Sequence, residues 1–247
     1  MSAQELLRAG QLKEAIAALL NEVRNNPADH RRRTFLFELL CFAGELERAG
    51  KHLGVLAGES PDAEVGALLY RSALSAYQKR ESLFEEGKLP ERVPALSRPG
   101  VLNGEPFDTI EDCDSRIGPR LEVFIAGECV WLPFEHIGSF RMAAPRLLRD
   151  TLWPSAQVSA GPALKGQEFG EVILPALYPF SWKHPNDAVK LGRETIWDDG
   201  GVPYGQKLLL LDGERVIPYL EIRELKFSDS EVAEAPAVAA APASPDT

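Results

Sequence analysis

The sequence contains few cysteines, no long apolar run and no excess of positive charge, and each absence narrows the possible functions. Its 247 residues include three cysteines, Cys41, Cys113 and Cys129, which lie far apart and form no C-x-x-C pair. This pattern argues against a disulfide framework or a structural zinc site, so we expect reduced thiols that pack as small apolar groups. The longest apolar runs, such as residues 208–211, are far shorter than the roughly 20 residues of a membrane-spanning helix.

The charge and the first residues of the chain exclude further classes. The formal net charge is −10, and the acidic excess lies after residue 89. The basic footprint that is typical of nucleic-acid-binding proteins is therefore missing. Residues 1–10 lack the basic start and the apolar run of a signal peptide. We expect a cytoplasmic protein whose partners are neither nucleic acids nor membranes.

Motifs of catalysis and of cofactor binding are also missing. The sequence has no G-x-S-x-G elbow, no G-x-x-x-x-G-K-[ST] phosphate loop, no G-x-G-x-x-G and no H-E-x-x-H. We therefore expect no catalytic residues, no bound metal and no cofactor.

One acidic group leaves an alternative open. Its members are Asp108, Glu111, Asp112, Asp114 and the nearby His136. Clustered carboxylates can bind a hard cation through their oxygens, which would make the chain a metal-dependent enzyme or regulator. However, the segment lacks the ligand spacing and the central glycine of an EF-hand loop. The arginines that follow it, Arg116 and Arg120, favour simple ion pairs instead.

The first 89 residues contain an internal repeat, which is the clearest signal in the sequence. The pattern G-[QE]-L-x-x-A-x-x-x-L begins at Gly10 and again at Gly44, an offset of 34 residues, and Pro27 recurs as Pro61. This period is typical of tetratricopeptide repeats. The glycine allows a tight turn between two paired helices, the apolar positions form one helical stripe, and the proline ends the second helix.

A third unit begins after Pro61 but does not close. Residues 63–84 keep an uninterrupted helical pattern, and Gln78 stands where the turn glycine is expected. We therefore predict one long helix at the end of the array. Since about three units are needed before such repeats bury their faces, this short array must pack against another part of the chain.

The groove of a tetratricopeptide array is lined by the first helix of each pair and holds peptides or helices. In the second repeat this geometry predicts a partner-binding wall made of Arg31, Thr34, Glu38, Cys41 and Phe42. Cations in the first turn of a helix are disfavoured by about 0.3–1 kcal/mol each, which favours an acidic or helical partner near Arg31. The alternatives are that Arg31 forms local ion pairs on a solvated face, and that Phe42 packs beneath the third helix.

After the helices the pattern changes to strands. Residues 90–106 are rich in proline and glycine, which is typical of a linker. Residues 121–125 and 129–134 alternate around Gly127, and residues 207–211 and 215–217 flank the turn pair Asp212-Gly213. Both patterns predict antiparallel hairpins. Residues 143–153 predict a short helix.

These signals predict an α+β chain with four regions. A tetratricopeptide-like helical array occupies residues 1–89, a linker residues 90–106, a β-rich and mostly antiparallel domain residues 107–227, and an acidic Ala/Pro-rich tail residues 228–247. The composition of the tail predicts disorder. Trp182, in a loop between prolines, is the best candidate for an exposed aromatic anchor.

The second domain carries an ordered set of motifs. They are residues 112–119 (DCDSRIGP), 121–124 (LEVF), 131–134 (WLPF), 149–154 (RDTLWP), 175–179 (PALYP) and 191–197 (LGRETIW). In this order the motifs resemble the ImpE family, also called SciE-type or TagJ-like, whose members are accessory proteins of bacterial type VI secretion. The resemblance extends over residues 3–227.

The resemblance implies a non-catalytic adaptor of the type VI secretion system. Members of the family are thought to bind the small subunit of the contractile sheath through the N-terminal helix of that subunit. They would thereby influence sheath assembly, or its disassembly by an AAA+ ATPase. A groove between helices suits such an amphipathic helix, although the groove residues above come from the repeat and not from the resemblance.

Overall fold

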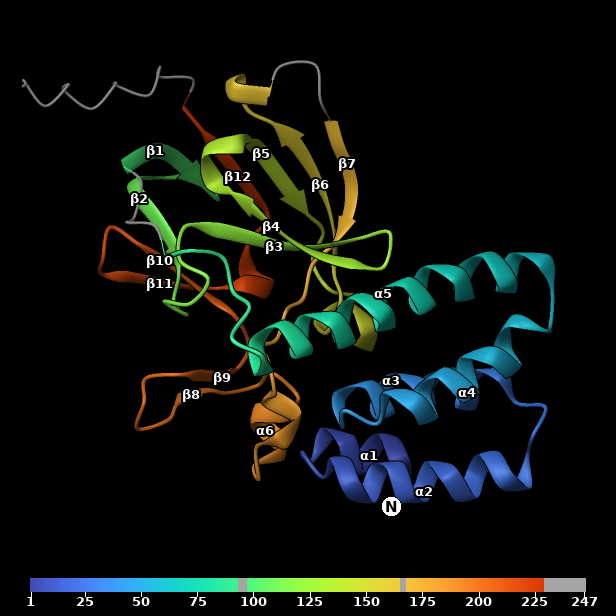
Figure 1. The fold of residues 1–247 in the computed structure, drawn as a ribbon. Coiled ribbons are helices and arrows are strands. Elements are labelled where there is room, and N and C mark those ends of the chain that lie inside the picture. Colours follow the sequence, from blue (N-terminus) through green and yellow to red (C-terminus); the bar gives the residue numbers. More distant parts are fainter. Residues whose placement is uncertain (93–96, 165–167, 229–247) are drawn as a thin grey trace, which may run out of the picture.

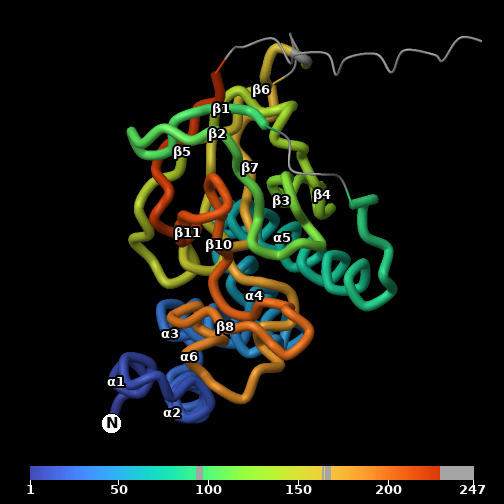
Figure 2. Tube along the Cα trace, turned by 90° about the vertical axis from the view of Figure 1, so that its left-hand side faces the viewer, coloured from blue at the N-terminus to red at the C-terminus, as the bar shows by residue number. Residues whose placement is uncertain are grey.

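The computed structural model describes residues 1–92, 97–164 and 168–228. The first helices gather at one end of the molecule and a curved sheet lies at the other, with the long helix α5 between them (Figures 1 and 2). The five helices of the first part are α1 (Ala3–Arg8), α2 (Leu12–Asn25), α3 (His30–Phe42), α4 (Leu46–Ala57) and α5 (Pro61–Glu85). The α+β class predicted from the sequence is confirmed.

The helix boundaries follow the repeat. Helices α2 and α4 begin two residues after Gly10 and Gly44, whose φ angles are 77° and 72°. Glycine adopts this left-handed conformation without steric cost. Helix α5 is continuous over 25 residues, as the missing turn signal predicted. It begins with Ser60, whose hydroxyl accepts a hydrogen bond from the Ala63 amide (3.1 Å), and with Pro61 at its first position.

The segment expected to be a linker is partly a strand, so that expectation is wrong for residues 97–106. Strand β1 (Ser97–Leu102) pairs with β2 (Glu105–Asp112) on one side and with β12 (Glu224–Phe227) on the other. The register of β1 and β2 shifts between Ser97 and Gly100, and Pro99 lies within this irregularity. A strand tolerates proline at such a point because no ladder hydrogen bond is lost there. Residues 93–96, and the predicted tail from residue 229 onward, lie outside the described residues.

The second part is a ten-stranded sheet in the order β11-β10-β2-β1-β12-β5-β6-β7-β3-β4, and its neighbours pair antiparallel. Its further strands are β3 (Arg120–Ile125), β4 (Glu128–Pro133), β5 (Ile137–Met142), β6 (Ser155–Ala160), β7 (Glu168–Ile173), β10 (Leu208–Leu211) and β11 (Arg215–Pro218). A separate hairpin consists of β8 (Thr195–Trp197) and β9 (Pro203–Gly205), and it follows the short helix α6 (Asp187–Lys190).

Both hairpins predicted from turn residues are present. Strands β3 and β4 are joined through Ala126 and Gly127, with φ angles of 50° and 81°. Strands β10 and β11 are joined through Asp212 and Gly213, with φ angles of 55° and 73°. Two successive positive φ angles are typical of the turn that matches strand twist. The helix predicted over residues 143–153 is wrong, because only the short 3₁₀ helix η2 (Leu148–Thr151) forms there.

Two apolar cores stabilise the fold. The second core lies within the sheet, around Phe140 and Leu225. The first core unites the helices with segments that come from the second part, among them Leu152, Trp153 and Leu177. The helical array therefore packs against the rest of the chain, as its shortness required.

Four buried charged side chains join the two parts. Arg80 of α5 donates from Nη2 to Glu122 Oε2 of β3 (2.6 Å), and Lys207 lies between Glu122 and Asp112 of β2. Arg80 also donates to the carbonyl oxygen of Leu177 (3.0 Å). The side chains of Arg80, Glu122 and Lys207 are completely buried. Two cations and two anions compensate one another here, which a buried charge requires.

Over residues 1–92, 97–164 and 168–228, the structure has no helix with the length and apolar character needed to cross a membrane.

Candidate functional site

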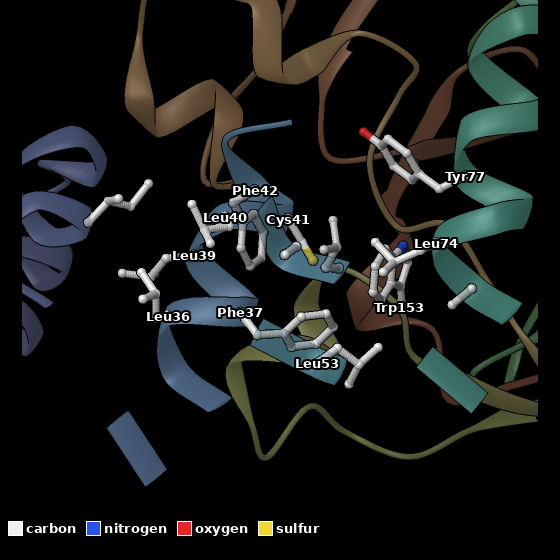
Figure 3. Close-up of a cluster of buried hydrophobic side chains, with 14 of the residues drawn as sticks. Leu36, Phe37, Leu39, Leu40, Cys41, Phe42, Leu53, Leu74, Tyr77 and Trp153 are labelled. Carbon is white, nitrogen blue, oxygen red and sulfur yellow. The ribbon is translucent and has the colours of Figure 1, made fainter. Parts of the chain in front are cut away.

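The inner face of the array is formed by α3 and α5. On α3, the residues His30, Thr34, Phe37 and Glu38 line a hollow on this side, and Cys41 belongs to the buried core. On α5, the residues Ala63, Ala67 and Tyr70 line the same hollow, and Leu74 and Tyr77 belong to the same core. Figure 3 shows side chains of both helices meeting around Trp153. The two ends of this face differ, because one is covered and the other is open.

The second part of the chain covers one end of the face. The ring centroid of Trp153 lies 6.5 Å from that of Phe37, 6.4 Å from Tyr70 and 6.2 Å from Tyr77. Trp153 is 5% exposed, since it fills the space between α3 and α5. Beyond it, Trp182 packs on Gly44, where an added Cβ would lie 2.3 Å from the ring.

The other end of the face remains a hollow of about 330 Å³. It is lined by His30, Thr34, Phe37, Glu38, Leu53, Leu56, Glu59, Ala63, Ala67, Tyr70 and Arg149. All of these except Arg149 come from α3, α4, α5 or the turn between the last two helices. The floor is apolar, and the polar groups stand at the sides.

A charged pair forms one wall of the hollow. Arg149, from η2, donates from Nη1 to Glu38 Oε1 (3.1 Å), and its guanidinium carbon lies 5.7 Å from the centre of the Tyr70 ring. Glu38 is 7% exposed. Its burial raises the pKa of the Glu38 carboxyl, and Arg149 opposes that rise. The Glu38–Arg149 pair and the ring of Tyr70 therefore lie together at the edge of the apolar hollow.

A second polar pair stands at the opposite rim. His30 Nε2 lies 3.2 Å from Glu59 Oε2, and both side chains are exposed. This contact links the first turn of α3 to the turn between α4 and α5. A partner that enters the hollow would pass between two polar edges and contact an apolar floor, as in helix-in-groove recognition.

The residues predicted for the groove wall do not all lie together. Thr34 and Glu38 line the hollow. Arg31 points elsewhere, into a second and more polar hollow of about 300 Å³ beside Leu19 and Phe35. The structure corrects the assignment of Cys41 and Phe42, which are each 1% exposed.

The physical reason differs between these two residues. Cys41 lies on the predicted face, but the second part of the chain covers that end of the face, and its burial raises the pKa of the thiol. Phe42 is buried in the first core, so it is not on an open groove wall. Neither side chain is accessible to a partner.

Trp182 is also not a free surface anchor. Its Nε1 donates to Glu81 Oε1 of α5 (2.8 Å), and its ring covers Gly44. The tryptophan therefore links the second part of the chain to the helices. Proline-rich surroundings indicated an irregular loop correctly, but they carried no information on what the loop contacts.

The run of arginines at the start of α3 is partly explained by local pairs. Arg32 bonds to Asp29 (2.6 Å) and to Glu22 (3.1 Å), and Arg33 donates to the carbonyl oxygen of Pro27 (2.7 Å). Asp29 also accepts a hydrogen bond from the amide of Arg32 and so begins the helix.

Of the residues that line the hollow, the predicted groove wall contained only Thr34 and Glu38, and Arg149, Tyr70 and Leu56 are among those that it missed. Tyr70 was visible as part of the apolar stripe of α5. Arg149 belongs to one of the motifs of the second domain, but its position against α3 depends on the tertiary fold.

The acidic group around residues 108–114 is not gathered into one site. Asp114 accepts from Arg116 (2.6 Å), and Asp112 pairs with Lys207 (2.9 Å). Within residues 1–92, 97–164 and 168–228, no three His, Cys, Asp or Glu side chains come together in a way that could hold a metal ion. The cations of the chain itself neutralise these two carboxylates.

Comparisons with known proteins give three likenesses. Residues 104–226 match the family model described as ImpE protein. The chain is 32% identical to the type VI secretion system accessory component TagJ of Pseudomonas aeruginosa, over 94% of this chain and 92% of that protein. The crystal structure of protein VPA1032 from Vibrio parahaemolyticus has the same fold, with a TM-score of 0.79 and 22% identity. That likeness covers 92% of this chain and 97% of the other.

Proposed function

Because the chain belongs to the ImpE family, which its likeness to TagJ over nearly its whole length supports, we propose that it is a non-catalytic accessory protein of the type VI secretion system. It binds another protein of that system through the hollow between α3, α4 and α5. The partner is the N-terminal helix of the small sheath subunit. Binding there influences sheath assembly or its disassembly by the AAA+ ATPase.

The open end of the inner face is the observation that carries this proposal. The hollow is lined by the apolar residues Phe37, Leu53 and Leu56, and the Glu38–Arg149 pair lies at its edge. Leu56 is the most accessible of the three, since Phe37 and Leu53 are only 2% and 3% exposed. An amphipathic helix presents apolar residues at spacings of three and four, flanked by polar ones. Such a helix can place apolar side chains on the floor while its polar residues meet Arg149, His30 or Glu59.

The size of the hollow favours side chains over a cofactor. At about 330 Å³ it is near the lower limit of small-molecule sites. The floor also lacks the convergent polar groups that orient a small molecule. A hollow of this kind accommodates a few anchor residues of a longer segment, which agrees with binding of a helix.

A binding titration with a labelled peptide tests the site. The peptide copies the N-terminal helix of the small sheath subunit from the same bacterium, and fluorescence anisotropy reports its affinity for the full chain. Leu56→Glu places a charge on the apolar floor and is expected to weaken binding at least about tenfold. Val55→Glu is the matched control, because the neighbouring Val55 is 48% exposed and does not line the hollow.

Two further outcomes define what the titration decides. Absence of peptide binding to the unaltered chain would contradict the adaptor function. Equal loss in Leu56→Glu and Val55→Glu, or loss in neither, would contradict the assignment to this hollow. Arg31→Glu examines the second hollow, and a loss there alone would move the site to that face. The effect on disassembly is measured as the rate at which the ATPase removes sheath, with and without the chain.

A further inference from the structure

The outer face of α5, opposite the array, is covered over only part of its length. Toward the end of the helix, Ser75 donates to the carbonyl oxygen of Gly127 in the β3–β4 turn (3.3 Å), and Lys79 pairs with Glu128. Toward its start, the helix extends beyond this hairpin (Figure 1). Among the described residues, nothing covers the outer face there.

Three large apolar side chains occupy this uncovered stretch. Val65 is 70% exposed, Leu68 65% and Leu69 50%. Their spacing of three and four residues puts them on one side of the helix. The repeat explains their position, since the second helix of the third unit would pack near here and the chain does not supply it. A contiguous apolar surface on a helix that ends an array is typical of an interaction site.

Two opposite charges flank the apolar residues. Glu64 and Arg71 are seven residues apart, so they lie two turns apart on the same side of the stripe, one before Leu68 and one after it. Both are exposed, and neither forms an ion pair with another described residue. Of the other exposed charges of this helix, Lys79 pairs with Glu128 and Glu85 with Lys183, whereas Asp62 at its start forms no ion pair with a described residue.

We infer that this face binds a second copy of the chain through an antiparallel pair of α5 helices. In a two-fold symmetric pair the same patch of each copy faces that of the other copy. A residue that precedes the centre of the contact on one helix therefore lies opposite a residue that follows the centre on the partner helix. With the centre between Ala67 and Leu68, Glu64 of each copy faces the partner's Arg71. A parallel pair would instead place like residues side by side, so the charge pattern favours the antiparallel arrangement.

The extent of the uncovered stretch agrees with this arrangement. Helix α5 begins at Pro61, and the β3–β4 hairpin contacts it from about Ser72 onward. In the antiparallel pair the start of one helix therefore comes close to the tip of the partner's hairpin, where Ile125 is 36% exposed. Three apolar side chains and two flanking charges form a limited patch. Since a standard interface buries roughly 1,200–2,000 Å², we expect a reversible dimer that forms at high protein concentration.

Charge exchange between Glu64 and Arg71 tests this inference. Sedimentation velocity is measured on the full chain over a wide concentration range. Glu64→Arg and Arg71→Glu each place like charges opposite one another in two pairs and are each expected to weaken self-association about tenfold. An equimolar mixture of the two variants restores association as a heterodimer, and the double variant E64R/R71E restores it as a homodimer.

The apolar contribution has its own variant and control. Leu68→Glu abolishes self-association, while Val55→Glu, at an exposed apolar residue of α4, leaves it unchanged. Circular dichroism and urea unfolding of each variant show that the fold is retained. An unaltered chain that stays monomeric up to its solubility limit would overturn the inference, as would charge variants that do not recover on mixing.

This outcome is separate from that of the proposed function. Leu68→Glu leaves binding of the sheath-derived peptide unchanged, because its side chain lies on the opposite side of α5 from the hollow. If Leu68→Glu instead removed peptide binding and left the oligomeric state unaltered, the outer face would belong to the sheath helix and the dimer would be refuted.

Discussion

The two halves of α5 have different surroundings. In the second half, Arg80 is completely buried and Tyr77 is 3% exposed, because the array lies on one side and the sheet on the other. In the first half, one side borders the hollow and the other side exposes Val65, Leu68 and Leu69. One continuous helix thus holds the fold together at one end and offers two accessible surfaces at the other.

This difference indicates how a short array can be stable while part of its inner face stays open. Two helix pairs and a single helix do not bury enough apolar surface alone. The second part of the chain covers one end of the inner face, through Trp153 and Trp182. The rest of the face borders the hollow, which Arg149 lines from the second part of the chain.

The largest effect on stability is expected from a substitution in the second, covered half of α5. Arg80→Met removes one cation from the buried group and leaves Glu122 poorly compensated, so the free energy of unfolding falls by about 3–5 kcal/mol. Lys79→Met is the control, because its pair with Glu128 is exposed and contributes only about 0–1 kcal/mol. Urea unfolding measures both. Similar losses in the two variants would show that the buried group does not join the two parts.

Trp153 lies where the two halves of α5 meet. Trp153→Ala removes its contacts with Phe37, Tyr70 and Tyr77 and leaves a cavity, which lowers the free energy of unfolding by about 3–5 kcal/mol. Trp197→Ala is the matched control, since this side chain is 47% exposed on β8, and its loss costs within about 0.5 kcal/mol. If Trp153→Ala were equally mild, the covered end would not be packed as described.

The buried charges also give the covered half a pH dependence. Burial alone would raise the pKa of Glu122, but Arg80 and Lys207 more than offset it and hold the pKa at about 2 instead of 4.5. Since this carboxylate binds protons less readily in the folded chain, stability is present above pH 4.5 and is lost as the pH falls toward 2. The loss amounts to about 3 kcal/mol.

The contribution of Asp112 to the pH dependence of stability has the opposite sign. Its burial raises the pKa to about 6, although Lys207 opposes the rise. Acidification from pH 6 toward 3.8 therefore favours the folded chain through this group. Urea unfolding at a series of decreasing pH values is expected to show a free energy of unfolding that first rises and then falls. Glu122→Gln should make the fall below pH 4.5 smaller without removing it, because the pKa of Asp212 is also lowered to about 2. An unchanged slope would contradict this origin.

A smaller difference in stability is expected between substitutions at the two turn glycines of the repeat. Gly44→Ala forces a Cβ into the ring of Trp182 in addition to the strain of a positive φ. Gly10→Ala carries the same strain, but its Cβ would meet only a flexible arginine atom at 3.6 Å. We expect Gly44→Ala to exceed Gly10→Ala in lost stability by about 1–3 kcal/mol. Thermal unfolding of the two variants checks this. Equal losses of stability would show that the Trp182 ring moves away from the added Cβ without a cost in free energy.

The smallest effect is expected in the uncovered half of α5. Leu68→Ser changes a side chain that is 65% exposed, so the free energy of unfolding of the dilute chain stays within about 0.5 kcal/mol of the unaltered value. Measurement at low protein concentration keeps self-association out of the comparison. A loss as large as that of Trp153→Ala would mean that this face is covered, and the contrast between the halves would disappear.

The sequence predicted the elements whose signals are local. Glycines at an offset of 34 residues gave the two helix pairs, the absent glycine at Gln78 gave the continuous α5, and Asp212-Gly213 gave a hairpin. It did not predict β1, because Pro99 and Gly100 have the composition of a linker while the partners of that strand, β2 and β12, lie on either side of it only in the folded sheet.

By itself, then, the sequence determined which residues of α3 and α5 share a face, since helical periodicity is a property of the chain. Only the tertiary structure decided that Cys41 is covered while Thr34 and Glu38 border a hollow. The covering residues, Trp153 above all, are distant in sequence. The position of an apolar residue in the sequence does not specify which surface its side chain packs against. Because the hydrophobic effect is not directional, which apolar surfaces meet depends on how the whole chain packs.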